Sequence, residues 1–389
     1  MNADTLSKNP EIDVYTENGQ EIWEVPPSAN TTYLTHGYFR YIGKFPPQIA
    51  SKLINDFYGG TGKVLDPMVG GGTVLTESVV RNIECVGWDI NPVSRLISTS
   101  VSRQVDSNQL KQVCESIINA LAKLNSDSPL FATSSTFTPY KLRLCKDYFD
   151  NDALIELSCA LSTLDSLSPH DDIRDLVMMI ILSCLRKISF ANVKKMNLEL
   201  DLNKKTKSTL LKEFSSKSKK VCDSNRILPN QFSKDLAKVL CKDAINWDST
   251  EKYNFISIHP PYLTNTAFSE ATQLQLAILD ICHKQIWQKE LKCRGSFLHE
   301  TNGLKKYIVN WGNIIKNAAE SLEKGGHLAL VVGDGQIDYI RIPIGAITVE
   351  LGKDYNLKLA KHAFHVLNNH TGQTQNKKMK GQHVIVFEK

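Results

Sequence analysis

The spacing of apolar residues predicts alternating helices and strands near the start of the chain. Between Ile49 and Tyr58, apolar residues recur every three or four positions, which is the pattern of an amphipathic helix. The glycine-rich segment 59–62 ends this helix. A short apolar strand at 63–65, a helix at 74–81 and a strand at 85–89 follow. A strand, a glycine-rich turn, a helix and a strand that ends in a carboxylate are typical of half of a doubly wound parallel sheet.

The middle of the chain has a different pattern, because the alternation stops between about residues 105 and 232. Apolar periodicity predicts helices at 110–124, 152–167 and 172–188, the last of them strongly apolar. A lysine-rich stretch follows, with seven lysines and one glutamate between Lys204 and Lys220. We interpret 105–235 as a largely helical insertion.

Strand and helix patterns resume in the last third of the chain. Strands are predicted at 239–243, 255–258 and 326–332, helices at about 269–291 and 307–322, and a closing antiparallel hairpin from 357–367 and 383–387. The first residues are polar and interrupted by proline, so we expect an arm over the main domain. The predicted organisation is an N-terminal arm (1–34), a sheet domain in two parts (35–104 and 236–389) and the insertion (105–235) between them.

The bulk composition fits an ordinary intracellular protein. Of the 389 residues, 42% are apolar and 22% are charged, and the net charge of +5 leans basic without indicating a polyanionic partner by itself. The nine cysteines show neither a Cys-x-x-Cys pair nor zinc-ligand spacing, so we expect reduced thiols and no metal site. No signal peptide or membrane-length apolar run is recognisable, so we expect a soluble, cytoplasmic protein without membrane partners.

A glycine-rich turn, Asp66-Pro67-Met-Val-Gly70-Gly-Gly72-Thr73, follows the first strand of the sheet domain. Its glycines permit positive φ and remove Cβ atoms that would collide with a ligand. The exposed amides of the following helix favour an anionic group such as a carboxylate. Asp89, at the end of the next strand, can accept hydrogen bonds from two ribose hydroxyls, a role that would also fit NAD. Asp66-Pro67 before the turn is atypical of dinucleotide sites.

A second motif, His259-Pro260-Pro261-Tyr262, follows the apolar strand Asn254 to Ile258. The glycine turn and this loop, in this order, resemble the S-adenosylmethionine-dependent amino-methyltransferases, which methylate an exocyclic nitrogen of a nucleobase. The resemblance covers roughly 35–100 and 236–389. It implies a Rossmann-like class I methyltransferase fold, an α/β domain with a mostly parallel seven-stranded sheet and a C-terminal antiparallel hairpin, and S-adenosyl-L-methionine as cofactor. The residues that it assigns to cofactor binding are Phe45, Pro46, Asp66, Pro67, Gly70, Gly72, Thr73, Asp89, Asn91, Asp243 and Ala244.

The Pro-Pro loop carries the catalytic residues that the resemblance implies. The carbonyl of Pro260 would accept a hydrogen bond from the target amino group, and Tyr262 would stack on a base flipped out of the helix. The family usually has Asp, Asn or Ser where this chain has His259, whose neutral imidazole can accept one hydrogen bond. No proline precedes a cysteine in the manner of the cytosine-C5 enzymes, so carbon methylation is not expected.

His259 does not identify the target base, because the family uses Ser, Asp or Asn at this position. The segments 263–276, 332–343 and 368–387 resemble the cytosine-N4 group, which favours cytosine N4 over adenine N6 in double-stranded DNA. The setting would be restriction-modification or phage defence, with a possible cognate restriction endonuclease. Two alternatives remain: an RNA guanine-N2 methyltransferase, and a catalytically silent nucleic-acid-binding protein.

The insertion is where target recognition is expected. Basic residues at the end of its apolar helix and in the lysine-rich stretch could contact DNA phosphates, namely Arg186, Lys187, Lys194, Lys195, Lys204, Lys205 and Lys207. A solvated, flexible linker explains the same lysine run equally well. The sequence predicts no recognition sequence.

Overall fold

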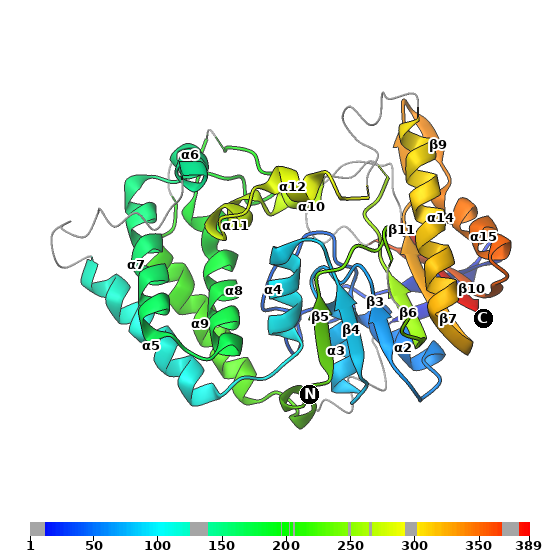
Figure 1. Cartoon of the computed structure of the whole chain (residues 1–389), viewed down its shortest axis with the longest axis horizontal. Coiled ribbons are helices and arrows are strands. Elements are labelled where there is room, and N and C mark those ends of the chain that lie inside the picture. Colours follow the sequence, from blue (N-terminus) through cyan, green and yellow to red (C-terminus); the bar gives the residue numbers. More distant parts are fainter. Residues whose placement is uncertain are drawn as a thin grey trace.

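The computed structural model describes residues 12–124, 139–195, 197–201, 203–204, 207–247, 250–263, 267–291, 302–367 and 381–389. One nine-stranded sheet crosses the molecule in the order β1-β2-β10-β11-β7-β6-β3-β4-β5 (Figure 1). Its strands are β1 (Asp13–Glu17), β2 (Gln20–Glu24), β3 (Val64–Asp66), β4 (Cys85–Trp88), β5 (Ala237–Leu240), β6 (Tyr253–Ile258), β7 (Leu322–Val332), β10 (Lys358–Val366) and β11 (Gly381–Glu388).

The predicted fold class is confirmed. The five strands β5, β4, β3, β6 and β7 run parallel to one another, whereas β11 runs antiparallel to both β7 and β10. The predicted number of seven strands is too low, however, because the N-terminal segment adds two more. β2 pairs in parallel with β10, and β1 folds back antiparallel on β2. The described part of the segment predicted as an arm, from residue 12 onward, therefore adds two strands to the sheet.

Helices cover both faces of the sheet because alternate strand residues point in opposite directions. On one face, Val64 packs with α2 (Pro47–Phe57) and α3 (Thr73–Val80). On the other face, Leu65 packs with α14 (Gly303–Ser321) and α15 (Ile344–Asp354). A small hairpin of β8 (Gly335–Ile337) and β9 (Ile340–Ile342) stands beside α14 in Figure 1. The short η1 (Asn230–Ser233) precedes β5.

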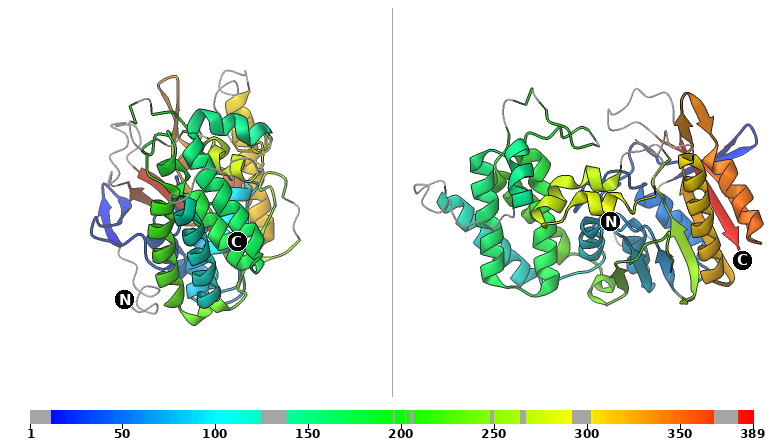
Figure 2. Two further views of the ribbon diagram at one scale, coloured as in Figure 1. Left: turned by 90° about the vertical axis from the view of Figure 1, so that its left-hand side faces the viewer. Right: turned by 45° about the horizontal axis from the view of Figure 1, so that its top comes forward.

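The insertion forms a helical body beside the β5 edge of the sheet (Figures 1 and 2). It contains α5 (Ser107–Leu124), α6 (Pro139–Tyr148), α7 (Asn151–Leu167), α8 (Asp171–Ile188) and α9 (Leu210–Arg226). The strongly apolar α8 is central, and its side chains share one hydrophobic core with the neighbouring helices. That core continues into α4 (Pro92–Val101) of the sheet domain, where Val93 and Ile97 are buried. The insertion is thus packed against the sheet domain rather than tethered to it.

The structure contradicts one alternative for the insertion and one predicted helix outside it. The lysine-rich stretch is not a flexible linker from residue 210 onward, because α9 buries Leu210, Phe214 and Val221 in the insertion core. The predicted helix 269–291 is instead three short ones, α10 (Phe268–Ala271), α11 (Gln273–Ile278) and α12 (His283–Trp287). Asp280 takes a left-handed conformation (φ 62°), and the amide of Ile281 donates back to the carbonyl of Leu276 at 2.8 Å, a closure that ends a helix.

β5 ends three residues before its predicted end. It pairs with β4 from Ala237 to Leu240, and β4 itself ends at Trp88, so residues 241–243 have no strand to continue along. Asp243 consequently lies in the loop after the strand. None of the helices in the described ranges has the length and apolarity needed to cross a membrane. Within the same ranges, no three His, Cys, Asp or Glu side chains gather in a metal-binding arrangement.

Candidate active site

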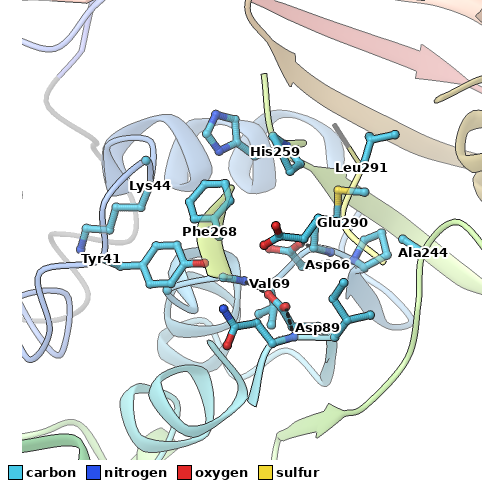
Figure 3. A pocket seen from close by; sticks show the side chains of 18 of the residues that line it. Tyr41, Lys44, Asp66, Val69, Asp89, Ala244, His259, Phe268, Glu290 and Leu291 are labelled. Carbon is cyan, nitrogen blue, oxygen red and sulfur yellow. Dashed lines mark hydrogen bonds between the residues drawn. The ribbon is translucent and has the colours of Figure 1, made fainter. Parts of the chain in front are cut away.

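A cavity of about 100 Å³ lies at the carboxyl ends of β3, β4, β5 and β6 (Figure 3). Parallel strands end at the same edge of the sheet, so residues far apart in the chain meet there. The cavity is lined by eleven of the predicted site residues: Phe45, Asp66, Pro67, Gly70, Thr73, Asp89, Asn91, Asp243, Ala244, His259 and Pro261. Four other predicted residues, Pro46, Gly72, Pro260 and Tyr262, are not among its lining residues.

The glycine turn is shaped by Asp89. One carboxylate oxygen of Asp89 accepts from the amide of Gly70 at 3.1 Å, and the other accepts from the amide of Asn91 at 2.8 Å. Gly70 (φ 47°) and Gly72 (φ 77°) both occupy the left-handed region, which side chains with a Cβ rarely adopt. A Cβ on Gly72 would lie 2.6 Å from Cγ2 of Val101, so this glycine also allows close packing of α3 against α4.

Two carboxyl groups face the cavity, that of Asp66, which is buried, and that of Asp89, which is partly buried. Burial raises the pKa of Asp66 to about 8, although its bond from the amide of Met68 opposes the rise and the charge of Asp89 adds to it. Burial also raises the pKa of Asp89 to about 6, against the hydrogen bonds from Asn91 and Gly70. Two neighbouring acids whose charged forms are disfavoured by burial favour a ligand that brings positive charge and hydroxyl donors. These residues therefore fit S-adenosylmethionine, which carries a sulfonium, an ammonium group and a ribose.

Asp243, which the resemblance assigns to cofactor binding, lies at the cavity as well. The carboxylate of Asp243 accepts from the amide of Ile245 at 2.9 Å and from the side-chain amide of Asn246 at 2.7 Å. These bonds close the loop and fix the carboxylate at the cavity wall, next to Ala244. Asn91 is the N-cap of α4. Its side-chain oxygen accepts from the amide of Val93 at 3.0 Å, and its side-chain nitrogen donates to the hydroxyl of Thr272 at 3.1 Å.

The Pro-Pro loop is held at both ends. The hydroxyl of Tyr307, on α14, donates to the carbonyl of Pro261 at 3.1 Å. The ring of His259 meets the ring of Phe45 edge-on, with centroids 5.0 Å apart, and its Nε2 lies 3.0 Å from the hydroxyl of Tyr262. The carbonyl of Pro260 has no hydrogen-bond partner among the described residues. The loop thus places the imidazole of His259 at the cofactor cavity, one residue before this backbone acceptor.

Burial sets the protonation state of the imidazole. It lowers the pKa of His259 to about 4, and nearby His365 lowers it further. The ring is therefore neutral at physiological pH, as acceptance of a hydrogen bond requires. Tyr262 is bound on its other side by the amide nitrogen of Gln382, on β11, so its hydroxyl is engaged with protein groups.

Several lining residues escaped the sequence motifs. The rings of Tyr41 and Phe268 stack with centroids 5.6 Å apart and planes 11° apart, and both face the cavity (Figure 3). Glu290 lines the same space, where it accepts from the amide and hydroxyl of Ser269 at 2.8 and 3.0 Å. Of these residues, Lys44 is the one that a local sequence pattern could have identified, because it directly precedes Phe45 and Pro46, which the resemblance assigns to cofactor binding. Burial lowers the pKa of Lys44 to about 8.

Most of the basic residues predicted to contact DNA have partners within the protein. Lys187 pairs with Glu213 at 2.6 Å and Lys207 with Asp150 at 2.9 Å. The ammonium of Lys204 donates to carbonyls of the turn after α8, and Arg186 does the same at Asn192, Lys195 and Ala271. The side chains of Lys194 and Lys195 are exposed, and Lys205 lies outside the described residues.

Comparisons with known proteins give sequence relatives of one kind. No protein-family model matches the chain. It is 32% identical over 88 residues to the type II methyltransferase M.MvaI of Kocuria varians, covering 22% of this chain and 19% of the relative. It is 30% identical over 84 residues to M.MjaII of Methanocaldococcus jannaschii, covering 22% and 16%, and 22% identical over 317 residues to M.BsoBI of Geobacillus stearothermophilus, covering 72% and 60%. The chain thus matches less than two thirds of the length of each of these relatives.

Solved structures resemble the chain only distantly. TrmN from Thermus thermophilus gives a TM-score of 0.31 at 10% identity, covering 90% of this chain and 50% of that one. The rRNA methyltransferase AviRa from Streptomyces viridochromogenes gives 0.32 at 9% identity, covering 90% and 88%. The relationship therefore depends on the sequence matches and not on these structures. On that evidence, the chain is similar in sequence to type II methyltransferases over part of their length.

Proposed function

We propose that this protein is an S-adenosylmethionine-dependent DNA methyltransferase that modifies the exocyclic amino group of a flipped base, most favourably cytosine N4. One observation carries the proposal: His259 and Pro261 of the Pro-Pro loop line the same cavity as Asp66, Gly70 and Asp89 of the cofactor half. Methyl transfer needs a donor and an acceptor side by side, and this cavity brings the two motifs together. The similarity to type II methyltransferases supports it.

The cofactor would supply an electrophilic methyl group on sulfur. Asp89 would accept hydrogen bonds from the ribose hydroxyls, since each of its oxygens makes one bond to the protein and has a further acceptor position. Asp243 and Ala244 would meet the adenine ring. Asp66, whose carboxyl group is buried at the cavity, would pair with the positive methionine end.

The chain's own contribution to the reaction would be alignment of the target nitrogen. The lone pair of a nucleobase amino group is delocalised into its ring, so acceptors on the amino hydrogens must turn the nitrogen toward the methyl group. The carbonyl of Pro260 would be the first acceptor. The neutral imidazole of His259 would be the second, in the place where the family usually has Asp, Asn or Ser. The low pKa of His259 supports this role because it keeps the ring neutral.

The choice of cytosine N4 depends on sequence resemblance in the segments after the loop, part of which (264–266 and 368–380) lies outside the described residues. Adenine N6 is the alternative within the same chemistry. A restriction-modification setting with a cognate endonuclease is proposed from the type II relatives.

The test is incubation of the protein with labelled S-adenosylmethionine and unmethylated DNA, followed by mass spectrometry of the nucleosides. We expect N4-methylcytosine. N6-methyladenine would keep the enzyme class and reassign the base. If no DNA base is methylated while calorimetry shows that the cofactor binds, the DNA proposal fails, and methylation of tRNA under the same conditions would then separate an RNA enzyme from a silent fold.

A further inference from the structure

A second cavity, of about 200 Å³, lies between the insertion and the sheet domain. Tyr41 and Phe268, the stacked pair, line both this cavity and the cofactor cavity, so the two spaces share an aromatic wall. The remaining wall comes from the 39–42 segment, from α8 and α9 of the insertion, and from α10 and α11. It therefore adjoins the proposed reaction site without belonging to it.

The second cavity has an excess of positive charge. Four basic side chains line it, Arg40, Arg186, Lys187 and Lys217, and Glu213 is the one carboxylate among the lining residues that the structure describes. Glu213 is already paired with Lys187 at 2.6 Å. Among the described lining residues, basic side chains therefore outnumber acidic ones by three, and this excess of positive charge favours the entry of an anion.

The electrostatics of the basic residues agree with their crowding. Burial lowers the pKa of Arg186, and the charge of Arg40 lowers it further. Burial also lowers the pKa of Lys217, with Lys220 and Lys187 adding to the effect, while the thiol of Cys184 opposes it. The positive charge of Lys217 also acts on the cofactor cavity, because it contributes to the lowered pKa of Lys44, which lines that cavity.

The cations are held in place before any ligand binds. The guanidinium of Arg186 donates to the carbonyl of Lys195 at 2.7 Å and to that of Ala271, on α10, at 2.9 Å. The ammonium of Lys217 donates to the carbonyl of Gly37 at 2.9 Å. The bonds to Ala271 and Gly37 connect the insertion to α10 and to the segment that precedes α2. Such fixed guanidinium and ammonium groups are suited to phosphate, whose oxygens accept several charge-assisted hydrogen bonds at once.

We propose that this second cavity binds a backbone phosphate of the substrate strand, next to the nucleotide whose base enters the reaction site. The proposal rests on the proposed DNA methyltransferase function. The aromatic wall separates the phosphate from the cofactor, and the insertion supplies three of the four cations. Arg186 and Lys187, predicted from the sequence to touch DNA, are here joined by Arg40 and Lys217 in one site.

The test compares duplex DNA binding by the wild type with that of the variants Arg40→Gln and Lys187→Gln. Arg40 and Lys187 are exposed, so both variants should fold, which circular dichroism would check. The control is Lys111→Gln, an exposed lysine on α5 of the same insertion that is not among the residues lining the cavity. The probe is a mixed-sequence 30-base-pair duplex, and the binding constant is followed by fluorescence anisotropy as salt is raised.

We expect the slope of log affinity against log salt to fall by about one in Arg40→Gln and to stay unchanged in Lys111→Gln, since each lost phosphate contact releases about one fewer counterion. Cofactor binding by calorimetry should be unchanged in all variants. If the wild type binds DNA and neither cavity variant changes the slope, the phosphate site is overturned and the proposed function stands. If the wild type binds the cofactor but no DNA, both are overturned.

Discussion

The imidazole Nε2 of His259 lies 3.0 Å from the hydroxyl of Tyr262, which in turn accepts a hydrogen bond from the side-chain amide of Gln382. With the tyrosine oxygen accepting from Gln382, its single proton is available to His259. In the tautomer that uses it, the Nε2 atom accepts and the other ring nitrogen carries the hydrogen. In this arrangement the tyrosine occupies the acceptor that the target amino group would need.

Replacing Tyr262 by Phe tests that relationship. The change removes the hydroxyl and leaves Nε2 of His259 as an open acceptor, so we expect the rate of methyl transfer to stay close to that of the wild type or to rise. Tyr262→Ala also removes the ring that supports His259, and we expect a loss of about 100-fold in kcat with cofactor affinity retained. Single-turnover kinetics and calorimetry measure both quantities. An equal loss in Phe and Ala variants would mean that the hydroxyl itself takes part.

His259→Ser supplies the side-chain oxygen that the family uses for cytosine. If His259 serves only as an acceptor, the serine variant should keep activity within about tenfold of the wild type, or exceed it. A complete loss with unchanged thermal unfolding would contradict the assigned role.

The pH profile of the wild type gives a second test of the role of His259. Since the pKa of His259 is lowered to about 4 in the folded protein, kcat should show no ionisation of this residue between pH 6 and 8. The stability linked to this lowering is present above the ordinary pKa of 6.5 and is lost as pH falls toward 4.

The raised pKa of Asp66 predicts that a proton is released when the cofactor binds. Its pKa is raised to about 8 in the folded protein from an ordinary value of 3.8, so this acid stabilises the free protein below pH 3.8, and that contribution is lost as pH rises through 8. A cationic ligand would ionise it. We therefore expect affinity for S-adenosylmethionine to increase from pH 6 to 8.

Calorimetry at pH 7 in two buffers of different ionisation enthalpy should detect the released proton. Asp66→Asn should abolish both the release and most of the pH dependence, whereas Glu350→Gln, an exposed acid on α15, should change neither. Release that persists undiminished in Asp66→Asn would place the titrating group elsewhere.

Gly72→Ala separates backbone strain from packing. Gly72 has φ 77° and a Cβ there would lie 2.6 Å from Val101, whereas Gly59 has nearly the same φ, 76°, with nothing within 4 Å. We expect Gly59→Ala to lower the free energy of unfolding by about 1 kcal/mol and Gly72→Ala by about 2–4 kcal/mol, the difference coming from the contact with α4. Denaturant unfolding without cofactor measures both, and equal losses would show that α4 moves aside.

Lys204 is expected to act on stability rather than on DNA binding. Its ammonium donates to the carbonyls of Arg186, Ser189 and Ala191, so Lys204→Met leaves buried acceptors unpaired and should cost about 1–3 kcal/mol. Exposed Lys195→Met should change stability by less than about 0.5 kcal/mol. Chemical denaturation and the salt slope of DNA binding distinguish the two roles. A stable Lys204→Met with a reduced salt slope would restore the sequence prediction for this lysine.

The amino-acid sequence by itself determined the features that depend on local chemistry. The glycine turn at 66–73, the acid at 89 and the Pro-Pro loop at 259–262 could be recognised because each needs particular residue types at fixed spacing, and their order along parallel strands places them at one edge of a sheet. The helices at 110–124, 152–167 and 172–188 were likewise recognisable, because a buried helical face leaves a periodic pattern.

The tertiary structure decided what depends on neighbours distant in the chain. Gln382 reaches Tyr262 only because β11 lies beside β7, and Phe268 stacks on Tyr41 only because α10 packs against the segment that contains Tyr41 and Gly43. The lysine-rich stretch could not be assigned from composition, since the same charges suit solvent, phosphate or backbone carbonyls. Lys204 donates to three backbone carbonyls, and Lys217 lines a cavity. These positions depend on contacts between residues distant in the chain, and such contacts leave no pattern in adjacent residues.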